Sequence, residues 1–255
     1  VKIVAVLRRS ALVAVGLLAW EACARSGAFH PILFPTLASI GRELAALLAR
    51  PDAIGEAWQS LARALSGIGL AAALGVLVGV AMGRSTLVAG LLDPLFSTTY
   101  PIPKIALFPI FIFALGIGSL SKVALIFLEC LYPIVINTYA GTRAVNRVLL
   151  WSAANMGASP GQTLRKIVVP AAAPYIFAGF RVALPIAMIV VTITEMIGSA
   201  DGLGYLAMYS LASLRTDRML AVVVIIALLG LGLDRLLVLL RDRLVFWERL
   251  ESYYG

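Results

Sequence analysis

Long stretches of this sequence contain no charged residue, and they limit what the chain can fold into. Residues 64–83 form an uncharged run of 20 residues, residues 105–121 one of 17 and residues 219–233 one of 15. Two further runs, residues 123–142 and 167–194, each contain a single charged residue. A helix of about 20 apolar residues is long enough to cross the ~30 Å hydrocarbon core of a bilayer. The pattern predicts an all-α polytopic membrane protein.

The composition agrees with this prediction. Hydrophobic residues make up 61% of the 255 residues and charged residues only 13%, whereas a soluble domain carries about 25% charged residues. The net charge of +8 would suggest nucleic-acid binding in a soluble chain. In a membrane protein, an excess of Lys and Arg is instead typical of cytoplasmic loops. We therefore expect a lipid membrane as partner and no nucleic acid.

The sequence predicts about six transmembrane helices. We place them at residues 5–25, 60–83, 104–118, 120–140, 174–197 and 219–239. The first of these also resembles a cleaved secretory signal, but the retained helix is the favoured interpretation. With both termini in the cytoplasm, the cytoplasmic segments hold 12 of the 21 Lys and Arg residues and the opposite loops hold 7, which fits the positive-inside rule.

These predictions divide the chain into three parts. Residues 1–59 contain the N-terminal transmembrane helix and an amphipathic helix that begins after Thr36 and lies on the membrane surface. Residues 60–242 form the core with five transmembrane helices and a cytoplasmic loop at residues 143–170. Residues 243–255 form a charged cytoplasmic tail.

The loop at residues 143–170 is too polar to cross a membrane but contains consistent helix signals. A short helix is predicted from Ala144 to Met156, where Gly157 supplies the left-handed conformation that ends it. Ser159 is a favourable N-cap and Pro160 occupies the first position of a second helix, which we expect to continue until Pro170 turns the chain. This rigid corner is suited to docking a partner; the alternative is a merely solvated loop.

Charged residues inside membrane spans are costly and are candidates for function. Glu129 lies near the middle of the fourth predicted span, where it either contacts a transported solute or anchors two helices. Arg181 and Glu195 share one face of the fifth span, but 14 residues of helix separate them by ~21 Å, so each needs a partner elsewhere. For this pair a structural or gating role is favoured. Asn137 lines a path or makes a polar contact between helices.

Three glycines, Gly75, Gly79 and Gly83, recur every fourth residue along the second predicted span. Such a stripe lets another helix approach closely. The neighbouring helix belongs either to this chain or to a second copy, and packing within the chain is the simpler expectation.

The residues needed for catalysis are scarce. The chain has one His and two Cys, and no stretch matches the phosphate-binding pattern GxxxxGK[ST]. We therefore predict no catalytic residue, no metal site and no bound cofactor. Any step driven by a nucleotide then requires a separate subunit that carries ATP and Mg²⁺.

The loop also resembles a known family. The segment WSAANMGASPGQTLRKIVVP, residues 151–170, is similar to the E-A-A-x-x-x-G-x9-I-x-L-P signature of permease subunits of bacterial ATP-binding-cassette importers. Ala153, Gly157, Ile167 and Pro170 match the signature, whereas Trp151 stands in place of the acidic residue. Further similarity to the nitrate, sulfonate and taurine branch lies in residues 102–122, 132–141, 164–184 and 194–206.

The resemblance implies a type I ABC importer permease in the bacterial cytoplasmic (inner) membrane. It implies a homodimer of the permease, two ABC ATPase subunits and an extracytoplasmic solute-binding protein. The contact with the ATPase is expected at Ala153, Gly157, Ala158, Ser159 and Pro160. The implied solute is small and polar or anionic. Heterocyclic vitamin precursors and aromatic acids are alternatives, and an ATP-independent channel or secondary transporter is the competing class.

Overall fold

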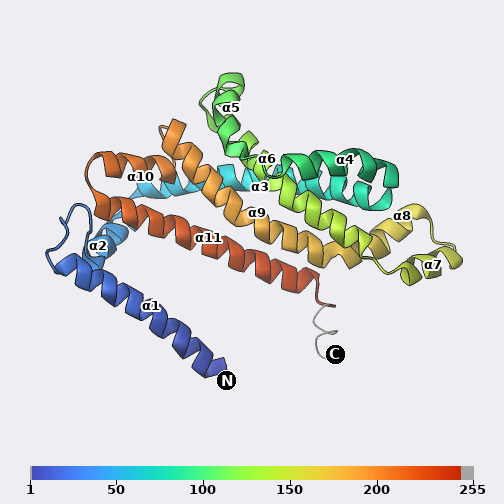
Figure 1. Ribbon diagram of the computed structural model, residues 1–255, viewed down its shortest axis with the longest axis horizontal. Helices are drawn as coiled ribbons and strands as arrows, with labels where there is room; N and C mark the ends of the chain where they lie inside the picture. Colours follow the sequence, from blue (N-terminus) through green and yellow to red (C-terminus); the bar gives the residue numbers. More distant parts are fainter. Residues whose placement is uncertain (1, 248–255) are drawn as a thin grey trace. The chain divides into compact units, whose positions relative to one another are not determined.

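The computed structural model describes residues 2–247, with side chains from residue 11 onward, and this part of the chain is helical without a β-strand (Figure 1). The α-helices are α1 (Lys2–Arg25), α2 (Leu37–Leu48), α3 (Pro51–Arg84), α4 (Thr86–Thr99), α5 (Phe108–Leu115), α6 (Ser119–Arg143), α7 (Arg147–Asn155), α8 (Pro160–Thr163), α9 (Val169–Gly198), α10 (Leu203–Ala212) and α11 (Thr216–Leu244). A 3₁₀ turn, η1 (Lys104–Leu107), precedes α5, and a π turn, η2 (Leu164–Val168), precedes α9.

Four helical segments in the described part are long and apolar enough to cross a membrane. They are α3, α6, the continuous helix Pro160–Gly198 that ends in α9, and α11. A fifth span is possible if α4 and the segment Lys104–Leu115, which meet at 88°, count as one broken crossing. The first predicted span falls in α1, which is not among the four; the side chains of residues 2–10 lie outside the described part.

The third predicted span, residues 104–118, is wrong as a single membrane-length helix. In the structure, this region is η1 followed by the eight-residue helix α5. Prolines explain the break, since Pro101 and Pro103 come just before η1 and Pro109 lies in the first turn of α5. Each proline lacks the amide hydrogen that would continue a helix from the preceding residues.

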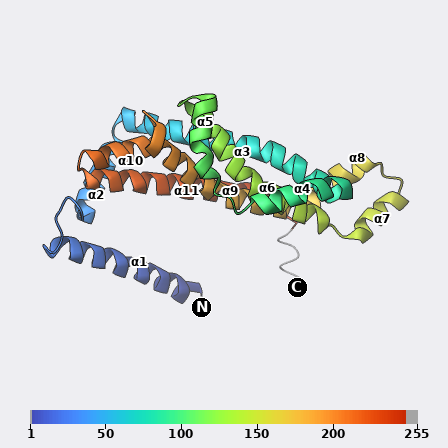
Figure 2. The ribbon, with the colours of Figure 1, turned by 45° about the horizontal axis from the view of Figure 1, so that its top comes forward.

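The described chain divides into two compact units. The first contains residues up to 60 together with residues 195–228, and the second contains residues 61–194 together with those from 229 onward. Each unit is described separately below. Both views of the ribbon (Figures 1 and 2) show the segments by colour along the chain.

A glycine stripe joins α3 to α6 in the second unit. A Cβ atom on Gly75 would lie 2.7 Å from Cγ2 of Ile134, and one on Gly79 would lie 2.6 Å from Cβ of Thr138. Gly67 and Gly83 contact α6 with equal closeness. The two backbones therefore approach more closely than any side chain on α3 would allow, and the expectation of packing within the chain is confirmed.

Helix α9 packs against a neighbouring face of α6 by the same means. A Cβ on Gly179 would lie 3.1 Å from both Cβ of Asn137 and the carbonyl oxygen of Pro133. One turn further along α6, Gly141 leaves room for the ring of Tyr175. Helix α6 is thus the central helix of the second unit.

Helix α4 covers α6 through aromatic and aliphatic side chains. Phe96 packs edge-on against Tyr132, and both lie in a cluster with Met82 and Val135. The buried Lys104 ammonium lies 3.9 Å from the centre of the Tyr132 ring and donates to the carbonyl oxygen of Tyr100 at 3.1 Å. A buried cation is thereby stabilised without a carboxylate.

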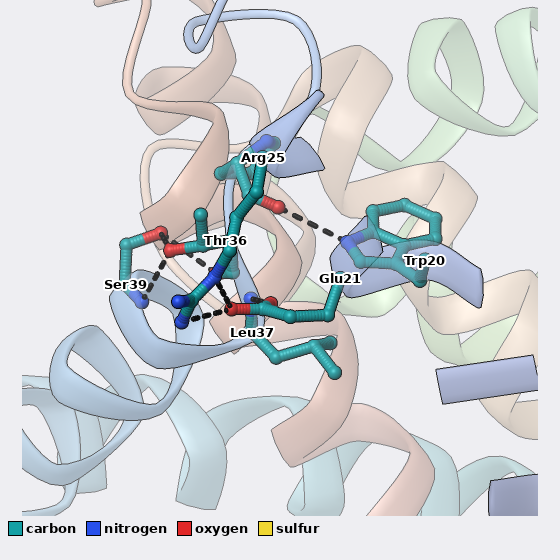
Figure 3. Close-up of polar contacts among 7 residues, drawn as sticks. Trp20, Glu21, Arg25, Thr36, Leu37 and Ser39 are labelled. Atoms are coloured by element: carbon teal, nitrogen blue, oxygen red, sulfur yellow. Dashed lines mark hydrogen bonds and ion pairs between the residues drawn. The ribbon is translucent and has the colours of Figure 1, made fainter. Parts of the chain in front are cut away.

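In the first unit, two hydrogen bonds join α1 to the start of α2, and a third caps α2 itself (Figure 3). The indole Nε1 of Trp20 donates to the Pro35 carbonyl oxygen at 3.0 Å, and a Glu21 carboxylate oxygen accepts from the Leu37 amide at 2.7 Å. Thr36 is the N-cap of α2, as predicted, and its hydroxyl oxygen accepts from the Ser39 amide. These bonds satisfy amides that the first turn of α2 leaves without intrahelical partners.

Candidate functional site

The predicted corner is present in the second unit and begins with a hydrogen-bonded end to α7. Gly157 has φ +75°, and its amide donates to the Ala154 carbonyl oxygen while the Ala158 amide donates to that of Ala153, both at 3.0 Å. This pair of bonds is the Schellman motif, which requires a left-handed residue where Gly157 stands. Ala153 is buried under the motif. Glycine is therefore favoured here by the left-handed backbone and not by close packing, since a Cβ on Gly157 would meet nothing within 4 Å.

The second half of the corner is a capping box at the start of α8. The Ser159 hydroxyl oxygen accepts from the Gln162 amide at 3.3 Å, and the Gln162 side-chain oxygen accepts from the Ser159 amide at 2.8 Å. Pro160 follows at the first helical position, where its missing amide hydrogen costs nothing. The prediction of Ser159 as N-cap is confirmed. The role of Gln162 was missed, although the spacing S-x-x-Q is a recognised signature.

The helices beside the corner differ from the prediction in two details. The first helix begins at Arg147 instead of Ala144, because Asn146 caps it by accepting from the Val148 amide at 2.9 Å. Pro170 does not turn the chain, since the helix continues from Pro160 to Gly198. The π turn η2 precedes Pro170 and accommodates the missing amide hydrogen within a continuous helix.

Together α7 and α8 form a stiff corner that lies beyond the neighbouring ends of α6 and α9 (Figures 1 and 2). Several large apolar side chains are exposed on it. Trp151 is 63% exposed and Met156 86% exposed, and Val148 and Leu149 are exposed beside them. Large apolar side chains gathered on a rigid, exposed element are typical of a protein–protein contact.

Glu195 lies in the first unit and is 1% exposed. Its carboxylate accepts from the Ser60 hydroxyl at 2.7 Å and from the Gly204 amide at 3.0 Å, while the Ser60 oxygen accepts from the Leu203 amide at 2.8 Å. Glu195 and Ser60 therefore cap the start of α10. This arrangement favours the structural role for Glu195, and Ser60 as its partner was not predicted.

Arg181 and Asn137 lie in the second unit. The Arg181 guanidinium, 61% exposed, forms an ion pair with Asp234 of α11 at 3.3 Å, which supplies the partner that the sequence required. The Asn137 side chain donates to the Pro133 carbonyl oxygen of its own helix at 2.8 Å.

Glu129 of α6 is half-buried and forms no hydrogen bond or ion pair with any other residue in the described part of the chain. It shares a face of α6 with the exposed residues Ile136 and Ala140, at intervals of seven and eleven residues. The carboxylate is thus open to a partner from outside this packed unit. No group of three or more potential metal ligands occurs among residues 2–247.

The fold and the corner define a class of protein: a polytopic α-helical membrane protein that presents a rigid helical element beyond the ends of its spans. Residues 71–246 match the family described as binding-protein-dependent transport system inner membrane component. The chain belongs to this family and is an inner-membrane permease component of an ABC transport system.

Three relatives match most of the chain. The taurine transport system permease protein TauC of Escherichia coli is 32% identical, over 95% of this chain and 92% of that protein. The aliphatic sulfonates transport permease protein SsuC of Bacillus subtilis, a putative assignment, is 31% identical over 96% and 88%. The nitrate import permease protein NrtB of Synechocystis is 30% identical over 73% and 68%.

A solved structure shares the fold. A chain of the MetNI methionine ABC transporter, in an inward-facing conformation, matches with a TM-score of 0.60 over 79% of this chain and 96% of that chain, at 19% identity. The predicted fold class, an all-α type I ABC importer permease, is confirmed.

Proposed function

We propose that two copies of this chain form the transmembrane pathway of an ATP-driven importer. Each copy docks an ABC ATPase subunit on the corner formed by Ala153, Gly157, Ala158, Ser159 and Pro160. The chain itself is non-catalytic, and ATP with Mg²⁺ is held by the ATPase subunits. An extracytoplasmic solute-binding protein delivers the solute on the opposite side.

The corner is the observation that carries this proposal. Two independent hydrogen-bonded caps fix α7 and α8 relative to each other, and α8 continues without a break into α9. A displacement of the corner is therefore passed directly to a membrane-length helix. The exposed apolar side chains around Trp151 provide a surface to which an ATPase can bind.

The orientation follows from this assignment. An ATPase binds ATP in the cytoplasm, so the corner and both termini lie on the cytoplasmic side of the inner membrane. The distribution of Lys and Arg supports the same orientation.

The solute that fits best is a small anionic or zwitterionic compound such as a sulfonate, taurine or nitrate. The names of three relatives support this class. A heterocyclic vitamin precursor is the second candidate, because the formylaminopyrimidine transport permease protein ThiX of Halalkalibacterium halodurans is 33% identical over 65% of this chain. The pathway candidates are Glu129, Asn137, Arg181 and Glu195. Of these, Glu129 is the best placed to meet a solute, because it has no partner within the part of the chain that the structure describes.

Purification of the chain from its native membrane in mild detergent tests the proposal. We expect a soluble ATPase to copurify in stoichiometric amount, and Gly157→Val to uncouple ATP hydrolysis from uptake while the permease still inserts. Gly161→Ala is the matched control, because Gly161 has ordinary helical backbone and free space around it. A chain that purifies alone and transports in liposomes without ATP would instead be a channel or secondary transporter.

A further inference from the structure

The break between α4 and η1, in the second unit, lies at the depth of the middle of a membrane span. Helix α4 ends at Thr99, and the segment Lys104–Leu115 continues at 88° to it. The Thr99 hydroxyl is 2.8 Å from the Tyr132 hydroxyl, and Tyr132 lies near the middle of α6. Because α6 is long enough to cross the membrane, the break is placed near the centre of the bilayer.

The backbone of the break is irregular and uncovered. Residues 100–103 are all exposed, and Pro101 and Pro103 have no amide hydrogen. Irregular backbone at membrane depth occurs only where it is buried in protein or lines a water-filled cavity. Since this chain does not bury the break, residues 100–103 face either a second copy or an aqueous path.

The polar groups around the break favour the aqueous path. Residues 97–100 are four consecutive hydroxyl-bearing residues, and all but Thr99 are exposed. The hydroxyls of Ser97 and Tyr100 form no hydrogen bond with another residue in the described part of the chain. Glu129, half-buried and three residues before Tyr132 on α6, adds a carboxylate at a neighbouring position. Polar and charged groups at this depth typically face a water-filled cavity or the interior of a bundle.

Lys104 fixes the break from behind. Its Nζ donates to the carbonyl oxygens of Tyr100 at 3.1 Å and Ile102 at 3.3 Å, and lies 3.9 Å from the centre of the Tyr132 ring. Lys104 is 5% exposed and forms no ion pair with any residue that the structure describes. Its positive charge therefore lies unneutralised by an ion pair behind the exposed hydroxyls, where it favours an anion in the adjoining space.

We propose that residues 97–103 form a wall of the solute pathway at the middle of the membrane. The hydroxyls of Ser97 and Tyr100 donate to an anionic group of the solute, and Glu129, one turn along α6 from Tyr132, receives a cationic group. Lys104 is a positioning residue that holds the wall and attracts the anion without touching it. The wall thus fits a small zwitterion. This inference rests on the proposed function, because a solute pathway requires a transporter.

The reaction of single cysteines with charged, water-soluble methanethiosulfonate reagents tests the wall. The variants are made in the full chain with Cys23→Ser and Cys130→Ala and studied with the partner subunits, in right-side-out and inverted membrane vesicles. We expect Tyr100→Cys to react from at least one side, because its thiol faces water. Leu231→Cys is the matched control: Leu231 is 59% exposed, against 52% for Tyr100, but lies in the middle of the unbroken span α11. It should remain unmodified because it faces lipid.

A second measurement tests Lys104. At Tyr100→Cys, the ratio of the reaction rates of the sulfonate-bearing and the trimethylammonium-bearing reagent reports the local electrostatic potential. Adding Lys104→Met should lower this ratio several-fold, whereas Lys104→Arg should preserve it, because the arginine keeps the charge and the donors. A purely structural role of Lys104 would change both rates together and leave the ratio as it was, which would remove Lys104 from the proposal.

Three results would overturn the wall itself. The first is a Tyr100→Cys thiol that reacts from neither side of the membrane. The second is a disulfide between two copies of Tyr100→Cys that forms under mild oxidation while the reagents fail to react, which would assign the break to a contact between copies. The third is equal reaction of Tyr100→Cys and Leu231→Cys, which would show that exposure alone decides.

The outcome is separable from that of the proposed function. If Tyr100→Cys reacts as expected but no ATPase copurifies with the wild type, the wall stands as part of a channel or secondary transporter and the importer assignment fails. If the ATPase copurifies and Tyr100→Cys does not react, the wall fails alone.

Discussion

The hydroxyl of Ser60 and the carboxylate of Glu195 are joined by a 2.7 Å hydrogen bond, although 135 residues separate them in the sequence. The same Ser60 oxygen accepts from the Leu203 amide and the same carboxylate accepts from the Gly204 amide. One side-chain pair from α3 and the end of α9 therefore provides the N-terminal cap of α10, whose N-cap residue, Gly202, has no side chain of its own.

Ser60→Ala should destabilise the protein. The substitution leaves the buried Leu203 amide without its acceptor and removes one donor from Glu195, and an unsatisfied buried polar group costs about 1–3 kcal/mol. We expect a clear fall in the thermal unfolding midpoint of the detergent-solubilised protein. Ser213→Ala, at an exposed serine after α10, should leave the midpoint unchanged. Equal midpoints for the two variants would contradict this cap.

Gly79→Ala should separate α3 from α6. A Cβ there would lie 2.6 Å from Cβ of Thr138 and 2.9 Å from the Val135 carbonyl oxygen, so backbone must move. Overpacking of this kind costs about 1–3 kcal/mol. Gly69→Ala, in the same helix but with nothing within 4 Å, should instead stabilise the helix by about 0.8–1 kcal/mol. Opposite shifts of the two unfolding midpoints are the expected result.

Sequence patterns predicted the membrane class and the corner because both depend on local signals. Charge-free runs mark spans, and Gly157 with Ser159 and Pro160 marks a helix end followed by a helix start. The π turn before Pro170 was not predictable in this way. Proline usually ends a helix, and only the packed structure decides whether the helix continues past it.

The partners of the charged residues within the predicted spans could not be predicted from the sequence either. Glu195 and Arg181 were expected to need partners, but Ser60 and Asp234 lie far from them along the chain. No local spacing rule connects such positions, because the pairing depends on how the helices pack. The glycine stripe of α3 indicated a close contact without saying which helix made it.

Substitutions at Gly157 should rank by their tolerance of a left-handed backbone. An L-residue costs about 1–2 kcal/mol in this conformation, asparagine less, and a β-branched residue most. We expect ATP-dependent uptake to fall in the order wild type, Gly157→Asn, Gly157→Ala, Gly157→Val. Since space is free around Gly157, a loss that followed side-chain volume instead, with asparagine worse than alanine, would argue for a direct ATPase contact.

Glu129→Gln should change the choice between solutes that differ by an amino group. A carboxylate without a partner among the described residues is expected to stabilise a cationic or donor group in the pathway. In inverted or right-side-out vesicles with the complete system, we expect the uptake ratio of taurine to ethanesulfonate to fall several-fold in the variant. Asp93→Asn, at an exposed residue of α4, should not change the ratio. An unaltered ratio in Glu129→Gln would assign the residue to helix packing.

Trp151→Ala should weaken the binding of the ATPase to the permease. The dependence of that binding on salt concentration should not change. Trp151 stands where the signature that the loop resembles has an acidic residue, so an exposed apolar ring takes the place of a charge at this position of the corner. Buried tryptophans at interfaces commonly contribute 2 kcal/mol or more, which corresponds to a loss of affinity of about 30-fold. Apolar contacts are not screened by salt, so the wild-type complex should withstand about 0.5 M NaCl in a pull-down.

Trp58→Ala is the matched control, because Trp58 is equally exposed but lies on the opposite side of the membrane in the proposed orientation. A complex that dissociates in salt and is indifferent to Trp151→Ala would show that the ATPase is held by charges elsewhere on the loop.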